Sequence, residues 1–266
     1  MVVATDKAGL EEVRGWIRDA RRIVVLTGAG ISTESGIRDF RGPNGLWTKD
    51  PAAEKASQIS HYLADPEVRK AAWRGRVDTF GMPREPNDGH RALVDLEGSG
   101  RLLALLTQNV DGLHHAAGSD PRLVVEVHGT VREVVCLDCG DRAPMERALD
   151  RVRAGEEDPP CRSCGGILKS ATISFGQGLV QSDLLRADHA ARSCDLLLAL
   201  GTTLGVHPIA DVVPLAAGHG ARIVIVNQDP TEMDDIADAV VRGALGQVLP
   251  ALVADLPPVG GISTLA

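Results

Sequence analysis

The sequence predicts an α/β protein in which a doubly wound parallel sheet carries two inserted segments. Short, unbroken apolar runs alternate along the chain with stretches of helical periodicity. Such runs are typical of strands buried on both faces, as in a parallel sheet covered by helices on each side. Each run ends in glycine or polar residues, and these sheets bind ligands beyond the carboxyl ends of their strands. The functional residues are therefore expected at that edge.

The first expected element is a helix, in which Leu10, Val13 and Ile17 recur at helical spacing. A buried strand follows at residues 23–26 and ends at Thr27 and Gly28. Comparable runs predict four more strands, at residues 102–106, 124–127, 195–200 and 222–226. Functional-looking residues follow these strand ends within a few positions: Gly28, Gln108, His128, Gly201 and Asn227.

Two stretches interrupt this alternation and are expected to build a second lobe. Residues 43–89 form a polar, helix-like insertion, and residues 131–168 form a cysteine-bearing one. We therefore expect the chain to divide into a Rossmann-like domain, the two insertions and a loose tail. The Rossmann-like domain comprises residues 1–42, 90–130 and 169–256, and the tail comprises residues 257–266.

The cysteine-bearing insertion carries two Cys-x-x-Cys pairs. Cys136 and Cys139 are separated by 21 residues from Cys161 and Cys164. Paired thiolates at this spacing typically close a tetrahedral, four-thiolate zinc site. Four cysteines leave no open position on the metal, so we expect Zn²⁺ to hold a small zinc-binding lobe together rather than to perform chemistry.

Composition narrows the possible partners. The net charge of −8 disfavours nucleic acid and suits a partner that presents lysine or another cation. The densest apolar runs are too short to span a bilayer, and acidic residues precede any apolar stretch at the N-terminus. Only Cys194 lies outside the metal-type pairs, which fits a reducing compartment. We therefore expect a cytoplasmic monomer that binds neither membranes nor nucleic acid.

The segment after the first strand, Gly28-Ala29-Gly30, offers small residues and backbone N–H groups to a pyrophosphate. Taken alone it is a weak signal. The dinucleotide fingerprint expects a third small residue where Thr33 stands, and an acidic residue about 20 positions further on.

Longer motifs are more specific. Residues 28–42 read Gly-Ala-Gly-Ile-Ser-Thr-Glu-Ser-Gly-Ile-Arg-Asp-Phe-Arg-Gly, and residues 107–114 read Thr-Gln-Asn-Val-Asp-Gly-Leu-His. A His-Gly-Thr step at 128–130, the four cysteines, Gly-Thr-Thr-Leu at 201–204 and Val-Asn at 226–227 follow in order. Together these blocks resemble the sirtuin family of NAD-dependent protein deacylases, over roughly residues 12–253.

The resemblance implies a catalytic role for His128, with Asn109 and Asp111 placed around the nicotinamide and its ribose. An imidazole can take a proton from a ribose hydroxyl at neutral pH. In that family the acyl group of an acyl-lysine passes to ADP-ribose, giving nicotinamide, O-acyl-ADP-ribose and free lysine. A core histidine and a simple Asn-x-Asp turn are the alternative interpretations.

The resemblance further implies that NAD contacts come from all of these blocks. The implied contacts are Gly28, Ala29, Gly30, Ser32, Asp39, Phe40, Arg41, Gln108, Asn109, Asp111, Gly201, Thr202, Thr203, Asn227 and Leu245.

Substrate contacts are less closely matched. Ile173, Phe175 and Gly176 align with a segment that pairs with the substrate peptide as an added strand, but this segment lacks the family's proline, one aromatic residue and an acid. Desuccinylating members carry Tyr-x-x-Arg in the helical insertion, where this chain has Trp73 and Arg76. Arg76 could pair with an acyl carboxylate, or it could be a surface charge.

The sequence thus predicts an NAD-dependent protein lysine deacetylase that acts on acylated-lysine proteins or peptides and contains NAD and Zn²⁺ sites. Three alternatives stay open at this point: a desuccinylase-type enzyme using Arg76, a mono-ADP-ribosyltransferase, and a non-catalytic NAD or zinc adaptor.

Overall fold

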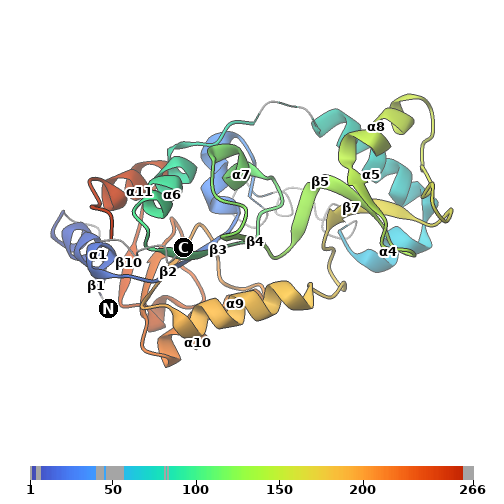
Figure 1. Cartoon of the computed structure of the whole chain (residues 1–266). Coiled ribbons are helices and arrows are strands. Elements are labelled where there is room, and N and C mark those ends of the chain that lie inside the picture. Colours follow the sequence, from blue (N-terminus) through green and yellow to red (C-terminus); the bar gives the residue numbers. More distant parts are fainter. Residues whose placement is uncertain are drawn as a thin grey trace, which may run out of the picture.

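The structure, a computed structural model, describes residues 2–3, 7–39, 45, 57–80, 82 and 84–259. Within them a large lobe is built on a seven-stranded sheet and a small lobe on a three-stranded sheet (Figure 1). The large sheet is wholly parallel, in the order β1-β10-β9-β8-β2-β3-β4. Its strands are β1 (Val2–Val3), β2 (Ile23–Thr27), β3 (Leu102–Thr107), β4 (Val124–Glu126), β8 (Leu196–Leu200), β9 (Arg222–Val226) and β10 (Ala239–Val241).

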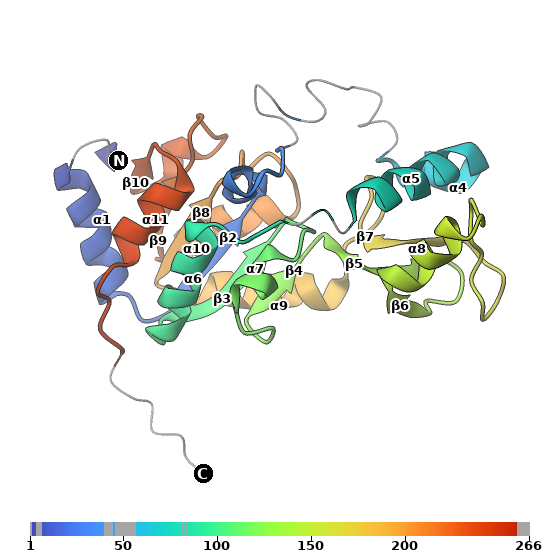
Figure 2. The same cartoon turned by 90° about the horizontal axis from the view of Figure 1, so that it is seen from above.

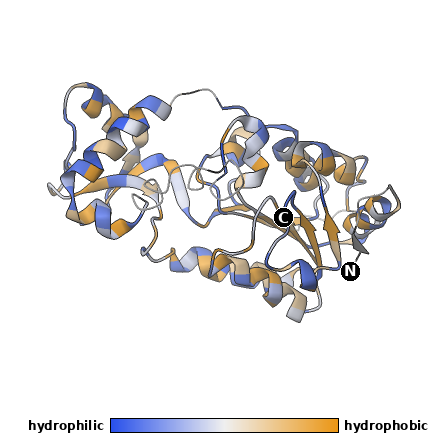
Figure 3. Ribbon diagram, turned by 180° about the vertical axis from the view of Figure 1, so that it is seen from behind, coloured by the Kyte–Doolittle hydropathy of each residue, from blue (hydrophilic) through white to orange (hydrophobic). Residues whose placement is uncertain are grey.

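The apolar runs bury both faces of this sheet. In β2, Ile23 and Val25 join the core on one face, whereas Val24 and Leu26 join the core on the other. The same alternation holds in β8, so strand residues point in turn to two separate cores. The strands accordingly form the most uniformly hydrophobic part of the ribbon in Figure 3.

Helices cover both faces, which confirms the predicted doubly wound fold. The first face packs against α1 (Lys7–Asp19), α6 (Asp88–Gly98) and α11 (Leu245–Val253). The second packs against α9 (Gln181–Ser193) and α10 (Val212–Gly218), which lie below the sheet in Figure 1. No helix in the described ranges has both the length and the apolar character needed to cross a membrane.

All five strands expected in the sheet are present, and two short strands extend the sheet beyond β9. Strand β10 has three residues and β1 has two. They escaped the sequence analysis because runs of this length carry no measurable periodicity.

The small lobe contains the antiparallel strands β5 (Gly129–Cys136), β6 (Arg142–Pro144) and β7 (Leu168–Thr172). Around them lie α4 (Ile59–Ala64), α5 (Pro66–Thr79) and α8 (Met145–Arg153), so both insertions contribute to one lobe (Figure 2). The expected domain boundary assigned residues 169–172 to the Rossmann-like domain, but β7 pairs with β5. We therefore propose that the small lobe extends to Thr172.

The two lobes meet where β5 leaves the large lobe and β7 returns to it. At this crossing Gly129 has φ +75°, and a Cβ there would lie 2.0 Å from the carbonyl oxygen of Ala171. Only glycine tolerates both conditions. His128, the preceding residue, is thereby held beside the junction, where its carbonyl accepts a hydrogen bond from the N–H of Ile173 at 2.7 Å.

Candidate active site

The glycine-rich loop follows β2 and is hydrogen-bonded to the end of the neighbouring strand β8. The N–H of Gly28 donates to Leu200 at 3.0 Å, and the N–H of Gly30 donates to Gly201 at 2.9 Å. A Cβ on either Gly28 or Gly30 would lie 2.7 Å from backbone of Gly201. These glycines are therefore required by the close approach of two loops. Their N–H groups are already bonded within the protein, so the sequence argument that they meet a pyrophosphate is not supported.

A cavity of about 770 Å³ opens at this strand edge and extends to the small lobe. It lies at the switch point of the sheet, where β2 is flanked by β3 on one side and β8 on the other. Most residues expected from the sequence line it: Gly28, Ala29, Gly30, Asp39, Arg76, Gln108, Asn109, His128, Ile173, Phe175, Gly176, Gly201, Thr202, Thr203 and Asn227.

The expected residues outside this lining have different surroundings. Leu245 borders a neighbouring cavity of about 80 Å³, which shares Gly30, Gly201 and Asn227 with the large one. Ser32 and Asp111 lie behind the cavity wall. Phe40 and Arg41 lie outside the described residues.

His128 is the imidazole that borders the junction of the two lobes within the cavity. Its Nδ1 lies 3.1 Å from the carbonyl oxygen of Gln108, and because a carbonyl only accepts, Nδ1 carries the proton. In the neutral ring, Nε2 is then left as a proton acceptor. Burial lowers the pKa of His128, which favours this neutral form at physiological pH.

Asn109 is held in one orientation by its neighbours. Its side-chain Nδ2 donates to the carbonyl oxygen of Gly28 and to Oγ of Ser32, both at 3.1 Å. Ser32 in turn donates to Asp111 at 2.7 Å. With both N–H bonds of the amide used, Oδ1 is the group of Asn109 that can accept a hydrogen bond from a ligand hydroxyl or a water.

The small lobe contributes two cations to the cavity, the partly buried Arg76 and the buried Lys169. Arg76 donates through Nη2 to Ser170 at 2.9 Å, while its Nη1 is buried and has no partner among the described residues. Lys169 is 2% exposed and donates to Thr172. Burial, followed by the charge of Arg76, lowers the pKa of Lys169 to about 8. This end of the cavity is electropositive.

Trp73 does not occupy the position that the sequence suggested. Its ring is fully buried in the small-lobe core. Arg76, one turn further along α5, lies over this ring with its guanidinium carbon 5.4 Å from the ring centroid, and it lines the cavity. Tyr62 of α4 lines the cavity together with Phe175, and its hydroxyl donates to Leu168 at 2.8 Å.

The segment expected to receive a peptide strand is partly occupied. The N–H of Ile173 donates to His128, and Phe175 exchanges hydrogen bonds with Ser57 and Ile59 at 3.1 and 2.9 Å. These backbone groups are unavailable to a substrate strand. Gly176 keeps its place in the cavity lining.

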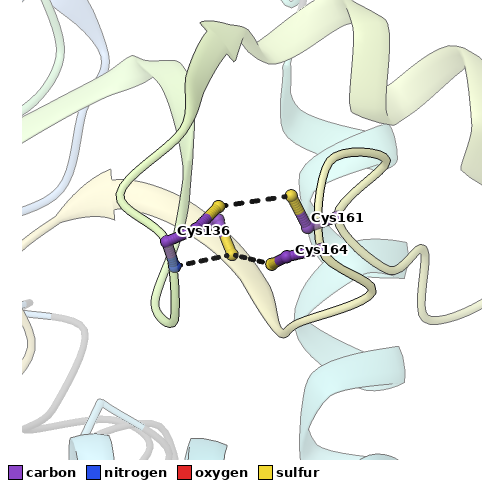
Figure 4. Close-up of side chains that lie close together, drawn as sticks. Cys136, Cys161 and Cys164 are labelled. Atoms are coloured by element: carbon purple, nitrogen blue, oxygen red, sulfur yellow. Dashed lines mark hydrogen bonds between the residues drawn. The ribbon is translucent and has the colours of Figure 1, made fainter.

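The four paired cysteines converge in the small lobe, on two facing loops (Figure 4). The Sγ atoms of Cys136 and Cys164 are 3.5 Å apart, and those of Cys139 and Cys161 are 3.8 Å apart. Thiolates at about 2.3 Å from a tetrahedral zinc ion lie about 3.8 Å from one another. The donor set and its spacing thus fit Zn²⁺, and none of the four cysteines lines the cavity.

Comparison with known proteins decides the family. The Sir2 family model matches residues 28–208. The chain belongs to the Sir2 family. The chain is 49% identical over 234 residues to NAD-dependent protein deacetylase 2 of Streptomyces coelicolor, covering 88% of this chain and 97% of that protein.

Solved Sir2 structures agree with the fold. One with a p53 peptide and NAD⁺ has a TM-score of 0.80 at 31% identity and covers 90% of this chain and 95% of that one. Another, with a deacetylated p53 peptide and 3′-O-acetyl ADP-ribose, has a TM-score of 0.83 at 31% identity and covers 91% and 96%.

In this Sir2-family protein, sequence analysis did not select Lys169, Tyr62 or Asp229 as cavity residues. Asp229 follows Asn227 by two positions, so its proximity could have been inferred. Lys169 and Tyr62 gave no such signal, because a lysine in a short strand or a tyrosine in a short helix is ordinarily exposed at one end.

Proposed function

We propose that this protein is an NAD-dependent protein lysine deacetylase that binds NAD and the acyl-lysine substrate in the cavity between its lobes. The proposal rests on the placement of His128. This residue lines the cavity, its Nδ1 is hydrogen-bonded to the carbonyl oxygen of Gln108, and its Nε2 is left as a base. Relatives named NAD-dependent protein deacetylases and Sir2 structures with NAD⁺ and peptide support it.

The positions of His128 and Asn109 in the cavity indicate a separate role for each in the reaction. Bound NAD supplies the ADP-ribose that accepts the acyl group as nicotinamide leaves. His128 takes a proton at Nε2 from a ribose hydroxyl, which makes that oxygen a better nucleophile. Asn109 presents Oδ1 to orient a hydroxyl or a water, because its amide N–H groups are fixed by Gly28 and Ser32. One water is consumed, and the products are nicotinamide, O-acyl-ADP-ribose and free lysine.

The remaining cofactor contacts follow the cavity wall. Gly201, Thr202, Thr203 and Asn227 lie beyond β8 and β9, and we assign them to the ADP-ribose part of NAD. Leu245 and the smaller cavity are assigned to the adenine side. Asp111 does not line the cavity, and we assign it a supporting role, because it accepts a hydrogen bond from Ser32, which in turn accepts one from Asn109. Four cysteines would hold Zn²⁺, which supplies structural cross-linking to the small lobe.

A second candidate, removal of acidic acyl groups, is favoured by one observation. Arg76 has a buried, unpartnered Nη1 in the cavity, and the Lys169 ammonium adds a second positive charge nearby. A carboxylate at the end of an acyl chain would satisfy this unpartnered donor of the guanidinium. The phenol of Tyr62 also lines the cavity, but it already donates to Leu168.

The test is nicotinamide release with matched acetyl-, butyryl- and succinyl-lysine peptides, with products identified by mass spectrometry. O-acetyl-ADP-ribose formed by wild type and absent with His128→Ala would support deacetylation, and succinyl preference would support the second candidate. Protein-bound label from adenine-labelled NAD would indicate ADP-ribosyl transfer instead. The cytoplasmic location and the monomeric state stay predictions.

A further inference from the structure

Two buried histidines lie behind the cavity and have no part in the chemistry described so far. His90 lies in the first turn of α6, and His114 lies in α7 (Leu113–Ala117). Their ring centroids are 5.0 Å apart, and they are 0% and 2% exposed. Neither lines the large cavity. Burial lowers the pKa of His90 to about 4 and that of His114 to about 3, so both rings are neutral at physiological pH.

The partners of His114 fix where its proton sits. The hydroxyl of Thr27 donates to Oγ1 of Thr107 at 2.8 Å, which leaves the Thr27 oxygen as an acceptor for Nε2–H of His114 at 3.0 Å. The Nδ1 atom of His114 is then an acceptor. In His90, Nδ1 lies 3.3 Å from the backbone nitrogen of Asn87 and 3.1 Å from its side-chain Oδ1, so it either accepts from the first or donates to the second.

One ring nitrogen of each histidine has no partner among the described residues. These nitrogens are His90 Nε2 and His114 Nδ1, and both are buried. Since buried polar atoms are almost always satisfied, we expect one ordered water to bridge the two nitrogens.

A chain of hydrogen bonds leads from this pair to Asn109. It passes from His114 to Thr27, the last residue of β2, and across to Thr107, the last residue of β3. Oγ1 of Thr107 accepts the backbone N–H of Asn109 at 3.1 Å. The carboxyl ends of two neighbouring strands are thereby coupled to the residue that faces the cavity.

A second route runs through the loop that follows β2. Asn87 donates through Nδ2 to the carbonyl oxygen of Ile31 at 2.7 Å and to Ser35 at 3.0 Å. Both belong to the short helix η1 (Ala29–Ser35), which carries Ser32. Ser32 accepts from Asn109 and donates to Asp111.

We propose that His114, supported by His90, is a positioning residue that sets Asn109 and Asp111 for the reaction. This rests on the proposed NAD-dependent deacetylation. Asn109 is assigned to the nicotinamide ribose, where the reaction takes place, whereas the adenosine end of NAD is assigned to residues beyond β8 and β9. Loss of the chain therefore reduces kcat much more than it raises KM for NAD.

The test compares His114→Phe, which keeps a ring but removes the Nε2–H donor, with His114→Gln, which retains an N–H donor. We expect kcat of His114→Phe to fall about 10- to 100-fold, the order that a misplacement near 1 Å produces, and His114→Gln to recover most of it. His115→Phe is the matched control, because His115 points to Glu126 at 3.7 Å and stands outside the chain. It should leave kcat and KM unchanged.

Thr27→Val breaks the same chain one bond further on and is used if His114→Phe does not fold, with Thr27→Ser as its conservative partner. A folded His114→Phe or Thr27→Val protein with wild-type kcat would overturn the proposal. Histidine ¹⁵N NMR of the ligand-free protein tests it without activity. His114 should be neutral and protonated at Nε2, and a His114 that carries its proton on Nδ1 would refute the chain. An inactive wild type with this NMR signature would instead reject the proposed function.

Discussion

Replacement of Cys161 by serine should release zinc and unfold the small lobe while the large sheet persists. Among the residues that the structure describes, the small-lobe core contains eight buried residues, two of which are Cys136 and Cys161, against 22 on each face of the large sheet. So small a core needs an additional cross-link. Structural zinc contributes on the order of 10 kcal/mol in small zinc domains, which is comparable to the entire stability of a typical domain.

Unfolding of the small lobe should also affect the cavity, because the electropositive end of the cavity belongs to the small lobe. Arg76 and Lys169 come from α5 and β7, whereas the NAD contacts come from the large sheet. We expect Cys161→Ser to lose peptide binding and to retain residual NAD binding.

Zinc content and hydrogen exchange provide the assay. Protection should be lost in β5 and β7 and retained in β2 and β8. Cys194→Ser is the matched control, because Cys194 is equally buried but lies in the large-lobe core, where its thiol donates to Ala191. A Cys161→Ser protein with full zinc and unchanged protection would refute this reasoning, as would zinc loss from Cys194→Ser.

Three further predictions concern the loop, the acyl group and pH. Gly30→Ala should lower the melting temperature and weaken NAD binding, because the added Cβ would lie 2.7 Å from the backbone of Gly201. The control is Gly75→Ala in α5, where the space around the glycine is open. This change should leave the free energy of unfolding unchanged or raise it by about 1 kcal/mol. Arg76→Met should lower turnover of a succinyl-lysine peptide far more than that of an acetyl-lysine peptide, and equal losses would exclude a carboxylate contact. Because His90 and His114 have folded-state pKa values of about 4 and about 3, below the ordinary 6.5, the unfolded chain binds more protons in this range. Their contribution to stability is complete above pH 6.5 and is lost as pH falls towards 4, which urea unfolding across that range would detect; an unfolding free energy that rises on acidification would contradict it.

Sequence reasoning succeeded where chemistry is concentrated in contiguous motifs. The cysteine spacing predicted a cluster that the structure assembles, and His128 and Asn109 follow strand ends and so meet at one edge of the sheet. Buried strands were recognisable because both faces are covered and every position is apolar.

The rest depends on packing between distant segments. Whether Trp73 or Tyr62 reaches the cavity is decided by how α4 and α5 dock on β7, which no local pattern encodes. Likewise, Gly28 and Gly30 matched a phosphate-binding pattern, but their N–H groups donate to Leu200 at the end of β8 and to Gly201 directly after it.

The most direct test of the account follows nicotinamide and O-acetyl-ADP-ribose in parallel, with NAD, an acetyl-lysine peptide, and either wild type or His128→Ala. We expect wild type to form both products in equal amounts, with an acidic limit of kcat/KM below pH 6.5 because burial lowers the pKa of His128. His128→Ala should be folded and bind NAD but form no O-acetyl-ADP-ribose. Wild-type rates in His128→Ala, or no deacetylation by wild type, would contradict the central claim.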